Sequence, residues 1–218
     1  MKIITCEDGA FPEINHLNHD FKTDSLRLRI TLDTTLSRDY YINLFPKLLF
    51  TVLDIFPNIR KHHCSHGQNS DTLRENSMDH LPSPIKLVGD VIDTVHLFEH
   101  LTLELQCLIG QMAQCSGLTC NYWSPENRFD VYIECDDSRI AQFSCNAAIA
   151  LFNNMLHAEE KMVSTLDAIY LAQTISKAGW QKQEIIKQKL GWSELKFEQA
   201  EEHLRTFAFP FRALSAVA

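Results

Sequence analysis

Residues 91–109 read VIDTVHLFEHLTLELQCLI, and apolar side chains recur in this stretch at helical spacing. Gly110 follows at the position where a helix C-terminus favours glycine. On a helical wheel of about 100° per residue, one face carries only leucines, at positions 97, 101, 105 and 108. We therefore expect a central helix that packs this face against a hydrophobic core.

A second stripe on the same helix carries His96, His100, Leu103 and Cys107, with Glu99 at its edge. Two histidines four residues apart project side by side from neighbouring turns, which is the spacing a zinc ion needs from a helix. This His-x-x-Glu-His arrangement makes His96 and His100 the predicted metal ligands and Glu99 the predicted general base. The alternative is a solvated polar stripe on a surface helix.

A third ligand is predicted from the polar stretch between Asn58 and Pro84, which we interpret as a long loop. Four candidate donors lie there within five residues, namely His62, His63, Cys64 and His66. Cys64 is the preferred ligand, because thiolates bind zinc strongly. Glu104 is a further candidate, either as a ligand or as an outer carboxylate that holds a histidine tautomer. The alternative is a loop of solvated histidines.

The remaining pattern predicts an α+β fold with an antiparallel sheet and packed helices, in the order β-α-loop-α-β-β-α. Residues 26–33, LRLRITLD, alternate like a half-buried strand, and apolar positions from Phe45 to Phe56 predict a helix ended by Pro57. Residues 118–123 and 129–135 predict a hairpin, and residues 138–156 a helix. We assign residues 1–160 to this α+β domain.

Residues 161–218 predict a helical appendage, with helices over 165–178, 181–190 and 193–207 separated by Gly179 and Gly191. Its short helix-turn-helix pattern is found in DNA-binding proteins and in plain helical hairpins. We favour packing, or formation of a homo-oligomer through these helices, because the chain carries a formal charge of −8. The same charge argues against nucleic acid as a general partner.

Composition points to a folded protein of the cytoplasm. No stretch approaches the roughly 18 consecutive apolar residues of a membrane helix, and the start, MKIITCEDGAFPE, reaches acidic residues before any signal-peptide core. The 7 cysteines include no Cys-x-x-Cys pair, so neither a disulfide framework nor a zinc finger is indicated. We expect reduced thiols and no membrane partner.

The motif residues resemble the amino-terminal domain of cyanophycin synthetase. That family carries a His-x-Cys-Ser segment, here His62-His63-Cys64-Ser65, and a His-x-x-Glu-His-x-x-x-Glu-Leu-Gln helix, here residues 96–106. The strand FDVYIECDD at residues 129–137 is similar to a further stretch of the family, and the resemblance spans about residues 26–156. It does not extend to the ATP-grasp and Mur-ligase-like domains of the synthetase, so we expect a stand-alone homologue of the amino-terminal domain.

The resemblance implies a domain that binds an arginine-bearing aspartate polymer and, in some members, hydrolyses it at a metallopeptidase-like site. Our first hypothesis is therefore a zinc-dependent hydrolase of peptide or isopeptide bonds, for which another divalent transition metal is the alternative ion. The second hypothesis is a non-catalytic polymer-binding or assembly module with a vestigial metal site, because the loop after Cys64 differs from the family pattern.

Overall fold

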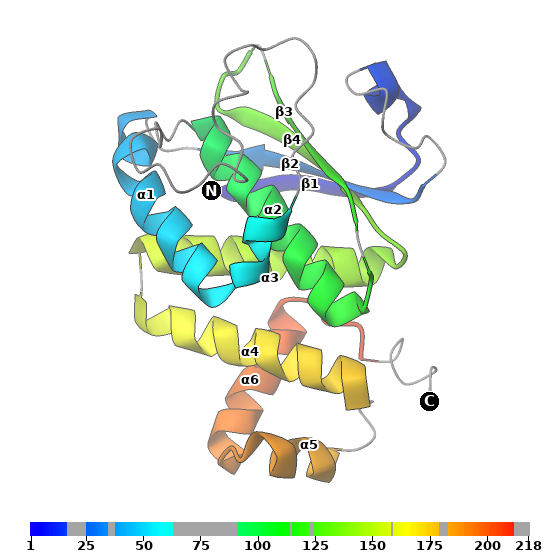
Figure 1. Ribbon diagram of the computed structural model, residues 1–218, viewed down its shortest axis with the longest axis vertical. Helices are drawn as coiled ribbons and strands as arrows, with labels where there is room; N and C mark the ends of the chain where they lie inside the picture. The colour runs from blue at the N-terminus through cyan, green and yellow to red at the C-terminus, as the bar shows by residue number, and fades with distance from the viewer. Residues whose placement is uncertain are drawn as a thin grey trace.

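The computed structural model describes residues 1–16, 25–34, 38–62, 91–113, 115–122, 124–157, 159–178 and 183–211. The fold is α+β, as predicted (Figure 1). In chain order its elements are β1 (Lys2–Gly9), η1 (Pro12–His16), β2 (Arg27–Asp33), α1 (Arg38–Ile55), η2 (Pro57–Lys61), α2 (Val91–Gly110), β3 (Gly117–Asn121), β4 (Arg128–Glu134), α3 (Ser138–His157), α4 (Glu159–Ala178), α5 (Gln183–Leu190) and α6 (Glu194–Thr206), where η denotes a 3-10 helix.

The strands form one antiparallel sheet in the order β1-β2-β4-β3. The predicted alternation in β2 is confirmed, since Leu28, Ile30 and Leu32 are all buried on the face that meets the helices. Helix α2 packs against β3 and β4, and α3 packs against β1 and β2. Figure 1 shows these two helices beneath the sheet, with α1 beside α2, α4 below α3, α6 below α4 and α5 at the bottom of the view.

The opposite face of the sheet carries a second, smaller apolar cluster. Ile14 of η1 and Tyr132 of β4 are buried together there, with Phe11 and Leu118 packed against them. The ring of Phe11 meets that of Tyr132 edge-on at 5.5 Å between centroids. Thr31 of β2 is buried on this face as well, where its hydroxyl donates to Asp130 at 2.7 Å, although the alternation predicts it on an open face.

The structure differs from the prediction most clearly in β1, in the segment after Pro57 and in the start of α4. Strand β1 is not predicted from the sequence, because most of its side chains are exposed on an edge strand and do not alternate. The predicted loop from Asn58 begins instead with the 3-10 helix η2, and its residues 63–84 lie outside the described part of the chain. Helix α4 begins at Glu159 rather than at Thr165, and the Asn154 amide of α3 donates to the hydroxyl of Thr165 at 2.9 Å.

The C-terminal helices share the main hydrophobic core. One cluster of buried side chains includes Phe98 of α2, Phe152 of α3, Ile175 of α4 and Leu204 of α6. Helix α6 is capped by Ser193, whose hydroxyl accepts a hydrogen bond from the Lys196 backbone amide. The division at residue 160 and the homo-oligomer stay predictions. Among the described helices, none is long and apolar enough to cross a membrane.

Candidate metal centre

Helix α2 carries the candidate site on a buried stretch of the molecule. It lies against the hairpin of β3 and β4, and side chains around the whole circumference of the helix are buried, including Leu97, Phe98 and Leu101 at 0% exposure. The exposed fractions of Glu99 and His100 are only 4% and 3%. The alternative of a solvated polar stripe is therefore wrong, because the packing of the hairpin and of η2 onto α2 removes this stripe from water. Polar groups in such a place need partners within the protein.

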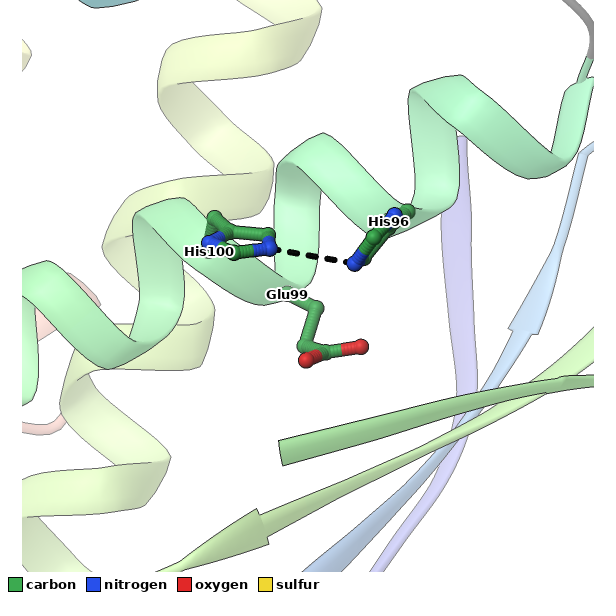
Figure 2. A group of neighbouring side chains, drawn as sticks. All are labelled: His96, Glu99 and His100. Carbon is green, nitrogen blue, oxygen red and sulfur yellow. Dashed lines mark hydrogen bonds between the residues drawn. The ribbon is translucent and has the colours of Figure 1, made fainter. Parts of the chain in front are cut away.

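His96 and His100 converge on one point. Their Nε2 atoms are 3.0 Å apart and their ring centroids 4.6 Å apart, with one turn of α2 between the two residues. Figure 2 shows the two rings facing each other. Two nitrogens bound to one tetrahedral zinc ion at about 2.0–2.1 Å would lie about 3.3 Å apart. The separation in the protein is close to this value, so a small side-chain rotation would place both nitrogens at bonding distance from one ion.

Glu99 points from α2 toward the strands, as Figure 2 shows. The Thr119 hydroxyl of β3 donates a hydrogen bond to its Oε2 atom. Burial raises the pKa of Glu99 from 4.5 to about 7, although the hydrogen bond from Thr119 acts in the opposite direction. The carboxyl group therefore exchanges a proton near neutral pH, which is the range in which a general base is most effective.

Gly117 provides the room that this carboxyl group occupies. A Cβ atom added at this position would lie 2.6 Å from Oε1 of Glu99 and 2.9 Å from its Cδ, which is closer than real Cβ atoms come. A glycine inside a strand often marks such a close approach. Neither Gly117 nor Thr119 is predicted as a site residue from the sequence. The glycine at the start of the predicted hairpin is the one signal that could have pointed to this contact.

His96, Glu99 and His100 can together hold a metal ion. One ligand atom from each lies within 4.8 Å of the other two. Two imidazole nitrogens and one carboxylate oxygen are a donor set found in catalytic zinc sites, where three protein ligands leave one position open. Burial and the neighbouring rings of His96 and His62 hold the pKa of His100 well below its usual range. The ring is therefore neutral, as ligation requires.

The other predicted candidates divide into two groups. His63, Cys64 and His66 lie outside the described residues. His62 and Glu104 are brought to the site, but on the far side of His100: Nδ1 of His62 is 3.0 Å from Nδ1 of His100, and Nε2 of His62 is 3.1 Å from Oε2 of Glu104. Both contacts point away from the space between His96 and His100, since His100 meets His96 through its Nε2 atom.

The sequence matches no model of a known protein family and no curated protein.

Proposed function

We propose that this protein is a metal-dependent hydrolase of peptide or isopeptide bonds with a zinc ion held by His96 and His100. The observation that carries the proposal is the convergence of two imidazoles, 3.0 Å apart at Nε2, beside a buried carboxyl group whose pKa is raised to about 7. The combination supports hydrolysis, because a metal site without a proton acceptor nearby can bind an ion but lacks the base that activates water.

Zinc is the preferred ion because imidazole nitrogen binds it more strongly than iron or manganese in the divalent series. The predicted thiolate of Cys64 as a further ligand would strengthen this preference, since thiolate is a soft donor. When bound, the metal would polarise the carbonyl group of the scissile bond. These preferences come from the chemistry of the donor atoms.

Glu99 takes the role of general base. Its carboxylate accepts the proton of the attacking water and returns it to the leaving amine, which balances the hydrolysis of an amide bond. The hydroxyl of Thr119 fixes the orientation of the carboxyl group, and Gly117 allows it to lie flat against β3. The resemblance to the amino-terminal domain of cyanophycin synthetase suggests an arginine-bearing aspartate polymer as the substrate.

The test combines metal analysis with hydrolysis. Protein reconstituted with zinc is assayed for release of peptides from cyanophycin, and Glu99→Gln is compared with Glu126→Gln, which changes an exposed glutamate of the β3–β4 turn. Glu99→Gln should keep the metal and lower the turnover rate by about 10²–10⁴-fold, because it removes the proton acceptor and spares both imidazoles. Full turnover in Glu99→Gln would contradict the role of base, and loss of the metal would reassign Glu99 as a ligand.

A second function is favoured by one observation. Glu99 and His100 are almost completely buried by the described residues, which suits a site that stabilises a fold as well as one that admits a polymer. The protein would then be a non-catalytic polymer-binding or assembly module. Binding and cleavage of the same polymer, measured side by side, separate the two functions: retention of intact polymer by zinc-loaded protein supports the module, and its cleavage supports the hydrolase.

A further inference from the structure

A chain of hydrogen-bonded side chains runs from η2 into the metal centre. Lys61 Nζ donates to Oδ1 of Asn58 at 3.4 Å, and Nδ2 of Asn58 donates to Oε1 of Glu104 at 3.3 Å. The other oxygen of Glu104 meets Nε2 of His62 at 3.1 Å. Nδ1 of His62 then meets Nδ1 of His100 at 3.0 Å. Each contact uses a different atom, so the chain is continuous from Lys61 to His100.

The proton positions on His62 and His100 follow from the carboxylate of Glu104. A carboxylate accepts hydrogen bonds and donates none, so Nε2 of His62 carries the proton that points at Glu104. When His62 carries a single N–H group, as a neutral imidazole does, its Nδ1 atom keeps a lone pair. Nδ1 of His100 must then donate to that lone pair. The lone pair of His100 is consequently on Nε2, the atom that faces His96.

We infer that Glu104 and His62 are positioning residues that fix the tautomer of His100, so that its Nε2 lone pair points into the space shared with His96. This role differs from metal ligation, because both ring nitrogens of His62 are occupied by hydrogen bonds. The inference rests on the proposed function in one respect, namely that the Nε2 lone pair of His100 binds a metal ion. The tautomer itself can be measured in the metal-free protein.

The packing around the chain holds its members in place. The backbone amide of His62 donates to the carbonyl of Ile59 at 3.1 Å, and the ring of His62 stacks on that of His100 with 5.2 Å between centroids. The side chain of Glu104 is only 7% exposed, so water competes little for its oxygens. Outer partners of this kind typically contribute 10–100-fold to metal affinity, because they orient the ligand and fix its tautomer.

The substitution Glu104→Gln should reverse the direction of the hydrogen bonds between position 104, His62 and His100. Lys61 holds Oδ1 of Asn58, so the Nδ2 group of Asn58 keeps pointing at position 104 and requires an acceptor there. The new side chain would offer its oxygen to Asn58 and its NH₂ group to His62. His62 Nε2 would then accept, His62 Nδ1 would donate to His100 Nδ1, and the proton of His100 would move to Nε2. That tautomer has no lone pair for a metal at this atom.

Two measurements on the full chain test this inference. Nitrogen-15 NMR of the histidine rings in metal-free protein reports the tautomer of His100, and competition with a chromophoric chelator reports the zinc affinity. We expect an Nδ1–H tautomer in the wild type, an Nε2–H tautomer in Glu104→Gln, and an affinity about 10–100-fold lower in that variant. Glu126→Gln is the matched control and should match the wild type in both measurements.

The outcomes separate this inference from the proposed function. An Nε2–H tautomer of His100 in the wild type overturns the inference, whether or not the protein hydrolyses anything. Unchanged tautomer and affinity in Glu104→Gln overturn it as well. A third outcome is that the wild type shows an Nδ1–H tautomer and binds zinc without hydrolysing a polymer. This result would support the positioning role and exclude the proposed hydrolase activity. The wild-type spectrum keeps the test valid even if the variant fails to fold.

Discussion

Two buried carboxylates lie on opposite faces of the same hairpin, and their surroundings differ. Asp130 of β4 and Glu99 of α2 have the same exposed fraction, 4%. Asp130 accepts from Arg29 at 3.0 and 2.7 Å, from Thr31 at 2.7 Å and from Tyr122 at 2.9 Å. Among the described residues, Glu99 accepts one hydrogen bond, from Thr119, and forms no ion pair with lysine or arginine.

The difference shows that burial alone does not mark a reactive group. The carboxylate of Asp130 is satisfied by a guanidinium and two hydroxyls, and these hydrogen bonds join side chains of the sheet. Glu99 accepts a single hydrogen bond, which does not offset the cost of burying its charged form. Its pKa is therefore raised to about 7. We therefore assign a structural role to Asp130 and a chemical one to Glu99.

The largest expected effect is the contribution of Glu99 to the pH dependence of stability. Its pKa in the folded protein is about 7, above its ordinary value of 4.5, so the folded state binds more protons than the unfolded state between these values. The stabilisation by protonated Glu99 is complete below pH 4.5 and is lost as the pH rises through 7. The difference between the two pKa values corresponds to a change in the free energy of unfolding on the order of 3 kcal/mol.

Denaturant unfolding of metal-free wild type and Glu99→Gln between pH 5 and 8 measures this effect. The lowered pKa of His100 acts in the opposite direction, since its stabilisation is lost as the pH falls below 6.5, but it is common to both proteins. The stability of the wild type relative to Glu99→Gln should therefore decline as the pH rises. A constant difference would contradict the raised pKa and with it the comparison with Asp130.

The second effect concerns the paired carboxylate. Asp130→Asn leaves the guanidinium of Arg29 without its counter-charge and should lower the free energy of unfolding by about 2 kcal/mol. This figure is below that for a fully buried pair, because the Arg29 side chain is 30% exposed and water can solvate it. Zinc affinity should not change. Asp54→Asn, at an exposed position of α1, is the control and should be near neutral.

Chemical denaturation and a zinc titration of these two variants provide the measurement. Weaker zinc binding in Asp130→Asn than in Asp54→Asn would contradict a purely structural role of Asp130.

The third effect is steric and smaller. Gly117→Ala places a methyl group where Glu99 now lies, so the carboxyl group must move away from Thr119. We expect a loss of about 1–2 kcal/mol in stability and a lower rate of hydrolysis, because the proposed base is displaced while both imidazoles stay in place. Gly9→Ala is the matched control in strand β1, where the nearest side-chain atom, in Phe11, is 3.9 Å from the added Cβ. Equal effects of the two substitutions on stability and on the rate of hydrolysis would contradict the contact between Gly117 and Glu99.

The sequence predicted the elements whose residue types follow a regular pattern. Helix α2, strand β2 and the hairpin are confirmed: apolar residues recur at helical spacing in α2 and at every second position in β2 and β4. Strand β1 was not predicted, because its place at the edge of the sheet depends on hydrogen bonds to β2, which its exposed side chains do not reveal. The early start of α4 was missed for a similar reason, since its first turns carry mostly polar residues.

The candidate site was predicted in part. The spacing of His96, Glu99 and His100 was sufficient to group them, because one helix turn fixes their neighbourhood. Their burial and their contact with Thr119 result from packing between elements that are distant in the sequence. No local sequence pattern predicts this packing. The sequence also left the roles of His62 and Glu104 open, and the structure places both on the far side of His100 from His96.

The central claim is that His96 and His100 bind one metal ion, and the zinc affinity of metal-free protein tests it most directly. The measurement is a chelator-competition titration of the wild type, His96→Ala and His203→Ala, the last of which changes a histidine of α6. We predict one zinc ion per chain in the wild type and in His203→Ala, and an affinity lower by more than about 100-fold in His96→Ala, because a lost ligand weakens binding more than a lost outer partner does. No stoichiometric zinc in the wild type, or equal affinities in all three proteins, would contradict the claim.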